Sequence, residues 1–375
     1  MTMRERILAV YRGETPDVVP FMLDLSHWFN HRHRRPFDID KPVTGPDYEL
    51  IDYHRQVGAG FYLANLTIFS HTRYTDDVAA TVERCDGNGR DTITWRLDTP
   101  VGAIERCRVW EPQTYAWGIR DWGVKTQQDL RVLQYALAHR TFSPDWDQYH
   151  AWAAAIGDNG VLYMPVGYSA IGHLMNLWMG VEGLVFAASD WPELLREVVD
   201  TINDNTLVLV DLIAASPADV VMITDNFSSD TQPPGFFNRW SRTFYEDAVD
   251  RLHAAGKYVA VHIDGRLRGA LSMIRDTGAD CADAVTPAPL GDLTAAACRG
   301  EAGDDFILSG GVPPDVWLPE ADVERFETAV LDWLELRRVS PGLIAAAGDQ
   351  VPPGAAEDRI RIMRDLIDDH GRYDY

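Results

Sequence analysis

The sequence predicts an α/β fold in which eight β/α units close into a single (β/α)8 TIM barrel over residues 1–375. Short apolar, β-rich runs alternate with amphipathic helical stretches along the chain. Such alternation favours parallel strands, because each return connection must cross over the sheet. Eight runs can be counted, and eight parallel units close naturally into a barrel. An open, doubly wound sheet is the alternative.

The expected strands, in chain order, are residues 18–23, 60–67, 161–166, 220–224, 257–262, 281–285, 306–309 and 343–346. Helices are expected at residues 48–57, 172–179, 192–214, 234–255, 266–277, 294–300, 323–338 and 356–370. The helix at 192–214 is preceded by Asp190, with Glu193 at the spacing of a capping box.

Residues 79–112 depart from this rhythm. Apolar and polar residues alternate over 92–97 and again over 103–109, with a Thr-Pro-Val-Gly segment between them. A period of two on both sides of a turn is typical of an antiparallel hairpin. We therefore expect an inserted hairpin after the second strand, lying over one mouth of the barrel.

Composition and charge exclude several classes of protein. The chain has 34 Lys and Arg against 57 Asp and Glu, a formal net charge of −23, which argues against a nucleic-acid partner. The four cysteines form no CxxC pair, so no zinc ribbon is expected. No apolar run approaches 18 residues and the first 13 residues read as an amphipathic helix. We therefore expect no membrane span and a cytoplasmic location.

Polar residues gather where the expected strands end, which is where a barrel keeps its chemistry. They are His27 after the first strand, Asn65 on the second, Tyr168 after the third, Asp225 and Asn226 after the fourth, His262 and Asp264 after the fifth, and Asp349 and Gln350 after the eighth. Each of them, taken alone, could instead be a helix cap or a loop anchor.

Three carboxylates and a histidine at one mouth indicate a cation site or a proton-transfer site. His262 and Asp264 are two residues apart on an extended strand end, so both side chains would point the same way. We expect His262, Asp264 and Asp225 to be catalytic, and His262, Asp264 and Asp349 to be the ligands if a metal is bound. Substrate contacts are expected from Asn226, Tyr168, Asn65, His27 and Gln350.

The sequence resembles the uroporphyrinogen decarboxylase superfamily, which includes cobalamin-linked methyltransferases. The resemblance is carried by residues 4–9, 13–17 and 19–20 near the amino terminus, by 256–265, by 286–292 and by 348–353. It implies a (β/α)8 barrel along nearly the whole chain, and a homodimer through paired barrel mouths.

Two departures from the family bear on the reaction. The arginine-rich loop with which the decarboxylases grip propionates is replaced by Asp24-Leu25-Ser26-His27-Trp28-Phe29, so a porphyrinogen is not expected as substrate. In the methyltransferase branch zinc is held by a His-x-Cys pair and a distant cysteine. Here Asp264 and Asp349 stand near those cysteine positions, a harder, oxygen-rich set that could still hold zinc.

Three functions remain open at this point. The first is a methyltransferase acting on a small substrate, with the corrinoid carried by a separate protein because no Asp-x-His-x-x-Gly motif is present. The second is a decarboxylase or other lyase acting on a small carboxylic acid. The third is a non-catalytic binding barrel. The absence of Walker, GxGxxG and GxSxG motifs argues against an ATPase or a Rossmann dehydrogenase.

Overall fold

The centre of the molecule is a six-stranded parallel sheet. The structure, a computed structural model, describes residues 1–35, 37, 39, 43, 45–63, 67–75, 77–85 and 91–373. The sheet has the order β14-β13-β12-β11-β10-β9. Its strands are β9 (Met164–Gly167), β10 (Val220–Phe227), β11 (Tyr258–Ile263), β12 (Cys281–Val285), β13 (Ile307–Val312) and β14 (Leu343–Ala347). Helices separate these strands along the chain, so the predicted α/β class is confirmed.

Two further parallel strands lie beside both edges of this sheet. β1 (Met22–Leu23) pairs with β2 (Gly60–Phe61). Isolated parallel bridges join Phe21 to Ala345 of β14, and Phe61 to Gly160 just before β9. Of the strand predicted at 60–67, the described residues form strand over Gly60–Phe61.

The helices that accompany the strands are mostly where the apolar periodicity placed them. They are α1 (Met3–Tyr11), α2 (Ser26–Arg32), α3 (Tyr48–Val57), α4 (Gln127–Ala138), α5 (Trp146–Ile156), α6 (Ala170–His173), α7 (Gly180–Asp190), α8 (Pro192–Ala214), α9 (Pro234–Trp240), α10 (Arg242–Ala254), α11 (Ala270–Arg275), α12 (Ala295–Ala302), α13 (Val323–Leu334) and α14 (Glu357–His370). The helix predicted at 234–255 breaks at Ser241, whose buried hydroxyl donates to Gln232 at 2.5 Å.

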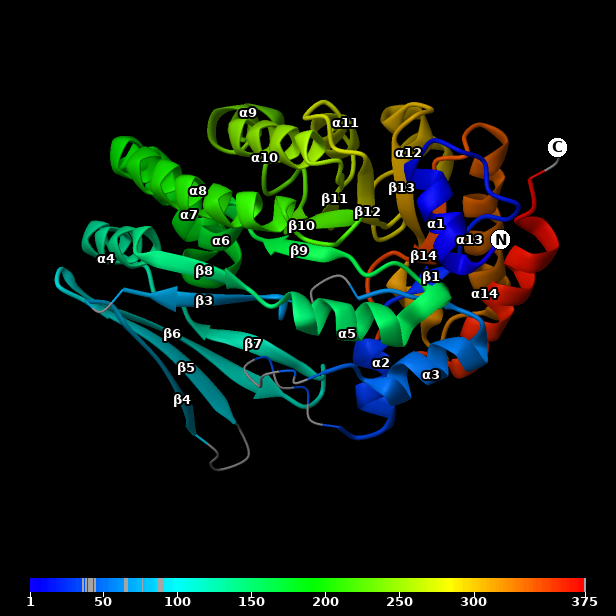
Figure 1. Ribbon diagram of the computed structural model, residues 1–375, viewed down its shortest axis with the longest axis horizontal. Coiled ribbons are helices and arrows are strands. Elements are labelled where there is room, and N and C mark those ends of the chain that lie inside the picture. Colours follow the sequence, from blue (N-terminus) through cyan, green and yellow to red (C-terminus); the bar gives the residue numbers. More distant parts are fainter. Residues whose placement is uncertain are drawn as a thin grey trace.

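The segment that departs from the β/α rhythm forms a four-stranded antiparallel sheet. Its strands, in the order β4-β5-β6-β7, are β4 (Ala79–Cys85), β5 (Thr92–Thr99), β6 (Gly102–Glu111) and β7 (Ala116–Asp121). β5 and β6 form the pair expected from the alternation, and β4 and β7 extend it on either side. Figure 1 shows this sheet at the opposite end of the molecule from α13, α14 and both termini.

A separate antiparallel pair, β3 (Ser70–Tyr74) and β8 (Arg140–Pro144), was not predicted. Its polar, largely exposed residues carry no apolar alternation. The pair joins the inserted sheet to the parallel strands (Figure 1).

The stretch Ala170–Asp190 is long and apolar enough to cross a membrane, by length and composition alone. In the fold it runs from α6 through a π-helical turn, Leu174–Met179, into α7. Of its most apolar 18 residues, 56% are buried inside the structure. The stretch therefore resembles a core helix of the fold.

Candidate active site

His262 and Asp283 form an ion pair at the centre of the parallel sheet. The register of β11 and β12 places the two residues side by side. The Nδ1–H of His262 donates to Asp283 Oδ2 at 2.9 Å, and both side chains are buried. Asp283 also accepts from Tyr62 Oη at 2.6 Å and from Ser309 Oγ at 3.2 Å. These three donors hold the carboxylate in place, and only Nε2 of the histidine ring is left to face the site.

A small enclosed cavity lies beside this ion pair. It is lined by Asp24, Tyr62, His262, Asp283, Ala284, Ala346, Ala347, Asp349 and Gln350. Asp24 Oδ1 accepts from the Ser26 backbone and hydroxyl at 2.9 and 2.6 Å, whereas its buried Oδ2 has no hydrogen-bond partner among the described residues. Three of the residues predicted at strand ends therefore line one cavity: His262, Asp349 and Gln350.

The pKa values of the two buried groups are suited to proton transfer. Burial would lower the pKa of His262, but the hydrogen bond and charge of Asp283, with Asp349 and Asp264, raise it to about 9. Burial raises the pKa of Asp24 to about 6, against the lowering effect of the Ser26 hydrogen bonds. The imidazole is therefore protonated at neutral pH, and Asp24 titrates near neutrality.

The His262 pair makes stability depend on pH. Because the folded pKa is about 9 and the ordinary value is 6.5, protonation of His262 stabilises the fold fully below pH 6.5. That contribution, on the order of 3 kcal/mol, should be lost as pH rises from 6.5 through 9. Urea unfolding at intervals across this range should show the fall in the wild type, and a flatter profile in His262→Asn. A wild-type profile that is flat between pH 6.5 and 9 would refute the pairing.

The predicted metal ligands do not assemble into a metal site. The nearest approach of His262 Nε2 to Asp349 is 3.9 Å, to Oδ1. In the part of the chain that the structure describes, no three His, Cys, Asp or Glu side chains are grouped so that they could hold a metal ion. Catalytic zinc takes three protein ligands, so His262, Asp264 and Asp349 as arranged do not fit it.

A larger, open cavity of about 650 Å³ lies next to the His262 pocket. It is lined from the strand ends by Tyr168, Asn226 and Asp264, which the sequence predicted, and from the inserted sheet by Arg108 and Ile119. Asp264 lies two residues from His262 and its charge acts on the His262 pKa, so the two cavities are neighbours. The candidate substrate residues thus divide between an inner polar pocket and an outer cleft.

Asp225 does not face either cavity. It is fully buried and accepts from the Ser169 backbone N–H at 2.6 Å, from the Ser169 hydroxyl, and from Tyr245 Oη at 2.6 Å. A Cβ added at Gly172 would overlap the Asp225 carboxylate. The geometry is that of a residue that fastens β10 to α6 and α10, where the sequence had suggested a catalytic residue.

His27 lies apart from the candidate site. His27 Nε2 lies 2.6 Å from the Tyr115 carbonyl, and its ring packs against Phe37 and Tyr115. The histidine therefore fastens α2 to the inserted sheet. Asn65 lies outside the described residues, so its predicted role stays a prediction.

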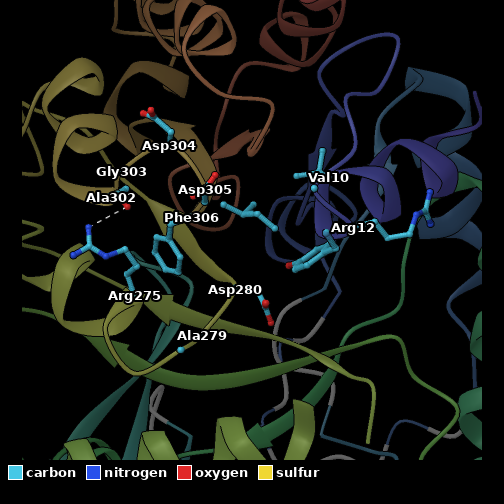
Figure 2. A pocket seen from close by; sticks show the side chains of 14 residues that line it. Val10, Arg12, Arg275, Ala279, Asp280, Ala302, Gly303, Asp304, Asp305 and Phe306 are labelled. Carbon is cyan, nitrogen blue, oxygen red and sulfur yellow. Dashed lines mark hydrogen bonds between the residues drawn. The ribbon is translucent and has the colours of Figure 1, made fainter. Parts of the chain in front are cut away.

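Another cavity, of about 580 Å³, lies at the amino-terminal ends of the parallel strands. Figure 2 shows Phe306, the residue directly before β13, on one side of it and Val10 and Arg12 of the amino-terminal segment on the other, with Asp280, directly before β12, below them. In α/β folds with a parallel sheet, ligands bind outside the carboxyl ends of the strands. We therefore place the active site at the His262 end.

Sequence reasoning missed Asp283 and Tyr62. Asp283 is the one charged residue within the apolar strand Cys281–Val285, and an unexplained carboxylate in a buried strand was a signal that could have been used. Tyr62 carried no such signal, because a tyrosine after an apolar strand is common in any core.

The chain shares its fold with a methyltransferase from Methanosarcina mazei (TM-score 0.62, 15% identity, covering 98% of this chain and 99% of that one). A type I 3-dehydroquinate dehydratase from Clostridium difficile is far less similar (TM-score 0.26, 9% identity, covering 56% and 94%). No curated protein matches the chain. The sequence profile of uroporphyrinogen decarboxylase (URO-D) matches residues 174–370, which is more than half of the chain and includes His262, Asp283 and Asp349. The chain therefore belongs to the uroporphyrinogen decarboxylase family.

Proposed function

We propose that this protein is a methyltransferase that moves a methyl group between a small substrate and a corrinoid carried by a separate protein. The observation that carries the proposal is the buried His262–Asp283 pair, in which Asp283 raises the pKa of His262 to about 9 and leaves Nε2 facing the site. Similarity of fold to a methyltransferase over the full length of both chains supports it.

The proposed role of His262 is that of a general acid. When a methyl group leaves a heteroatom, the electron pair of the broken bond stays on that atom, which then needs a proton. Nε2–H of His262 can supply it, and the imidazolium is available at neutral pH because its pKa is about 9. The corrinoid on its carrier supplies the nucleophile that takes up the methyl group.

The surrounding residues position the acid and restore its proton. Asp283 fixes the ring orientation and stabilises its charge, as a buried carboxylate does for a catalytic histidine. Asp349, 3.9 Å from Nε2 and 42% exposed, connects the histidine to solvent and can return a proton after each turnover. The unpartnered Oδ2 of Asp24 can accept a hydrogen bond from a substrate hydroxyl or amine.

The proposed function requires a closed barrel whose mouth is accessible to the corrinoid protein. The bridges from Phe21 to Ala345 and from Phe61 to Gly160 support closure of the eight strands. The cleft of about 650 Å³ supports access from outside. Zinc has no role in the proposed reaction, because His262, Asp264 and Asp349 are not grouped so that they could bind it.

A small carboxylic acid as substrate for decarboxylation is the second candidate. Asp24 favours it, since a buried carboxyl with a pKa of about 6 can both hold and release a proton at neutral pH. In that reaction the carbanion left by carbon dioxide would be protonated by His262 or Asp24.

One assay separates these candidates. The purified protein is incubated with reduced cobalamin and, in turn, with methanol, methylamines or methoxylated aromatics, and the corrinoid spectrum is followed. We expect methylation of the cobalamin with at least one donor, and its loss in His262→Asn. Release of carbon dioxide from small acids, without any corrinoid change, would overturn methyl transfer and establish the second candidate.

A further inference from the structure

The outer cleft carries two opposite charges that no described side chain neutralises. Its charged lining residues are Arg108, Asp230 and Asp264. Asp230 is engaged, because it accepts from the Ser228 hydroxyl and lies 3.5 Å from Arg266 Nε. Arg108 and Asp264 form no ion pair with any residue that the structure describes, and none with each other. Within the described structure, the cleft therefore offers one unpaired cation and one unpaired anion.

The guanidinium of Arg108 is partly buried without a counter-charge. Arg108 belongs to β6, and its Nη2 donates to the Asn176 carbonyl at 3.3 Å. Burial lowers the pKa of Arg108, and the group that acts against this shift is the phenol of Tyr168, which is uncharged at neutral pH. One bond to a carbonyl uses one of the five N–H groups of a guanidinium. A carboxylate in the cleft would therefore find both a charge and paired donors.

The carboxylate of Asp264 is fixed in position by its backbone and not by its side chain. The Asp264 backbone N–H donates to the Phe227 carbonyl at 2.7 Å, and no described side chain donates to the carboxylate. Its charge is among those that act on the His262 imidazole, so Asp264 marks the His262 end of the cleft. A cationic group in the cleft would find an acceptor there.

Hydrogen bonds tie both charged residues to the end of β10. Asn176, whose carbonyl accepts from Arg108, donates through Nδ2 to the Asp225 carbonyl at 3.3 Å. Asp264 is bonded to the carbonyl of Phe227, two residues farther along the same strand. Two residues of extended chain span at most about 7 Å. Arg108 and Asp264 are thus anchored to neighbouring points of one strand end, and both face one cleft.

Two local features beside these anchors are typical of ligand sites. Asn226 is exposed, lines the cleft and has a φ of 48°, in the left-handed region. Met175 and Asn176, which also line the cleft, belong to the π-helical turn Leu174–Met179. Strained backbone and π-helical turns recur at functional sites. Part of the wall is apolar and can contact the carbon atoms of a ligand: Ile119, Trp122, Met175 and Val181.

We propose that the outer cleft binds a zwitterion, a small molecule with a carboxylate for Arg108 and an ammonium group for Asp264. A guanidinium binds a carboxylate through paired N–H donors, and an ammonium group donates to a carboxylate. A ligand with one of the two charges would leave the opposite charge of the cleft unpaired. On the proposed function the nitrogen, at the His262 end, carries the methyl group, so the substrate class is that of N-methylated amino acids. This last assignment rests on the proposed function, and the zwitterion site does not.

The test measures the binding of matched ligands to the full chain by calorimetry. The zwitterions are dimethylglycine and γ-(dimethylamino)butyrate, two lengths of the same class. Isovalerate and its homologue with two more carbons replace the nitrogen by carbon, and dimethylethylamine and dimethylbutylamine replace the carboxylate by a methyl group. We expect at least one zwitterion to bind, and both of its analogues to bind about tenfold more weakly, because each leaves one charge of the cleft unpaired. Equal affinity of an analogue, or no binding of either zwitterion, would overturn the proposal.

Two variants assign the two ends of the bound zwitterion. Arg108→Met should weaken zwitterion binding about tenfold and leave the affinity for the amine analogue unchanged. Asp264→Asn should weaken zwitterion binding similarly and leave the affinity for the acid analogue unchanged or higher. Arg96→Met, which removes an arginine of the same sheet that pairs with Asp98 and Glu105, should bind as the wild type. Wild-type affinity for the zwitterion in Arg108→Met or Asp264→Asn would refute the site. If a variant does not fold, the ligand series on the wild type still decides.

The two proposals fail in different ways. Zwitterion binding that depends on Arg108 and Asp264, in a protein that transfers no methyl group to cobalamin, would leave the binding site standing and end the proposed function. Methyl transfer from methanol or a methoxylated aromatic, with neither zwitterion bound, would do the reverse.

Discussion

Replacing His262 by Asn is expected to lower the turnover number about 10²- to 10⁴-fold while leaving the fold intact. The Asn side-chain amide can still donate to Asp283 from near the position of Nδ1, so the buried carboxylate, which accepts from His262 at 2.9 Å, keeps a partner. What is lost is Nε2, the nitrogen that faces the site. Loss of rate without loss of folding would separate proton donation from packing.

The chain offers a matched control for this variant. His253 Nε2 lies 2.9 Å from Asp280 Oδ2, a similar His–Asp pair at the other end of the strands. His253→Asn should keep wild-type activity. Equal activity of the wild type and His262→Asn, measured with the donor that the corrinoid assay identifies, would exclude His262 as the acid.

The largest expected loss of stability comes from Asp225→Ala, about 3 kcal/mol in the free energy of unfolding. Asp225 accepts hydrogen bonds from the Ser169 backbone, the Ser169 hydroxyl and Tyr245. Its removal would leave these donors buried and unsatisfied, and would open a small void beneath Gly172. Urea unfolding should show the loss.

The activity of the folded fraction of Asp225→Ala distinguishes a structural role of Asp225 from a catalytic one. If it only fastens β10 to its helices, the folded fraction of Asp225→Ala should turn over nearly as fast as the wild type. Asp211→Ala is the control, since its exposed ion pair with Arg251 is worth little. A fully folded Asp225→Ala that is inactive would restore the catalytic role inferred from the sequence.

The alternation of residues within strands explains which of the predicted residues lie at the cavity beside the His262–Asp283 pair. On β10, Met222 packs in the same apolar cluster as Ala260 and Cys281, whereas Ile223 packs in the cluster that includes residues of α10. Side chains alternate between the two faces of a strand, so Asp225 falls on the face of Ile223. His262, two residues after Ala260, falls on the inner face.

Which face of a strand a residue occupies could be inferred from the sequence only by comparing neighbouring strands. A strand that is apolar on both faces does not reveal which of its residues point inward. A strand-end list therefore gathers residues from both faces, which is how Asp225 came to be grouped with His262. Comparing β10 with β11 in register would have separated them, and register was not available from one sequence.

The inserted sheet could be foreseen only in outline. The alternation over 92–97 and 103–109 predicted β5 and β6, because Ile93 and Leu97 of β5 and Ile104 of β6 are buried on one side of the sheet. β4 is exposed along its whole length and β3 is mostly exposed, so neither shows the periodicity from which strands are recognised. The arginines Arg106 and Arg108 were visible as polar positions, but nothing local indicated that their side chains turn toward the core side of the sheet.

The cavity at the amino-terminal ends of the strands (Figure 2) lies at the end of the sheet opposite to His262. Substitutions there should therefore affect stability and not turnover. Ala279 and Ala302 border it but are themselves buried in the core, so a larger side chain at either position should lower heat tolerance and leave the His262 site unchanged.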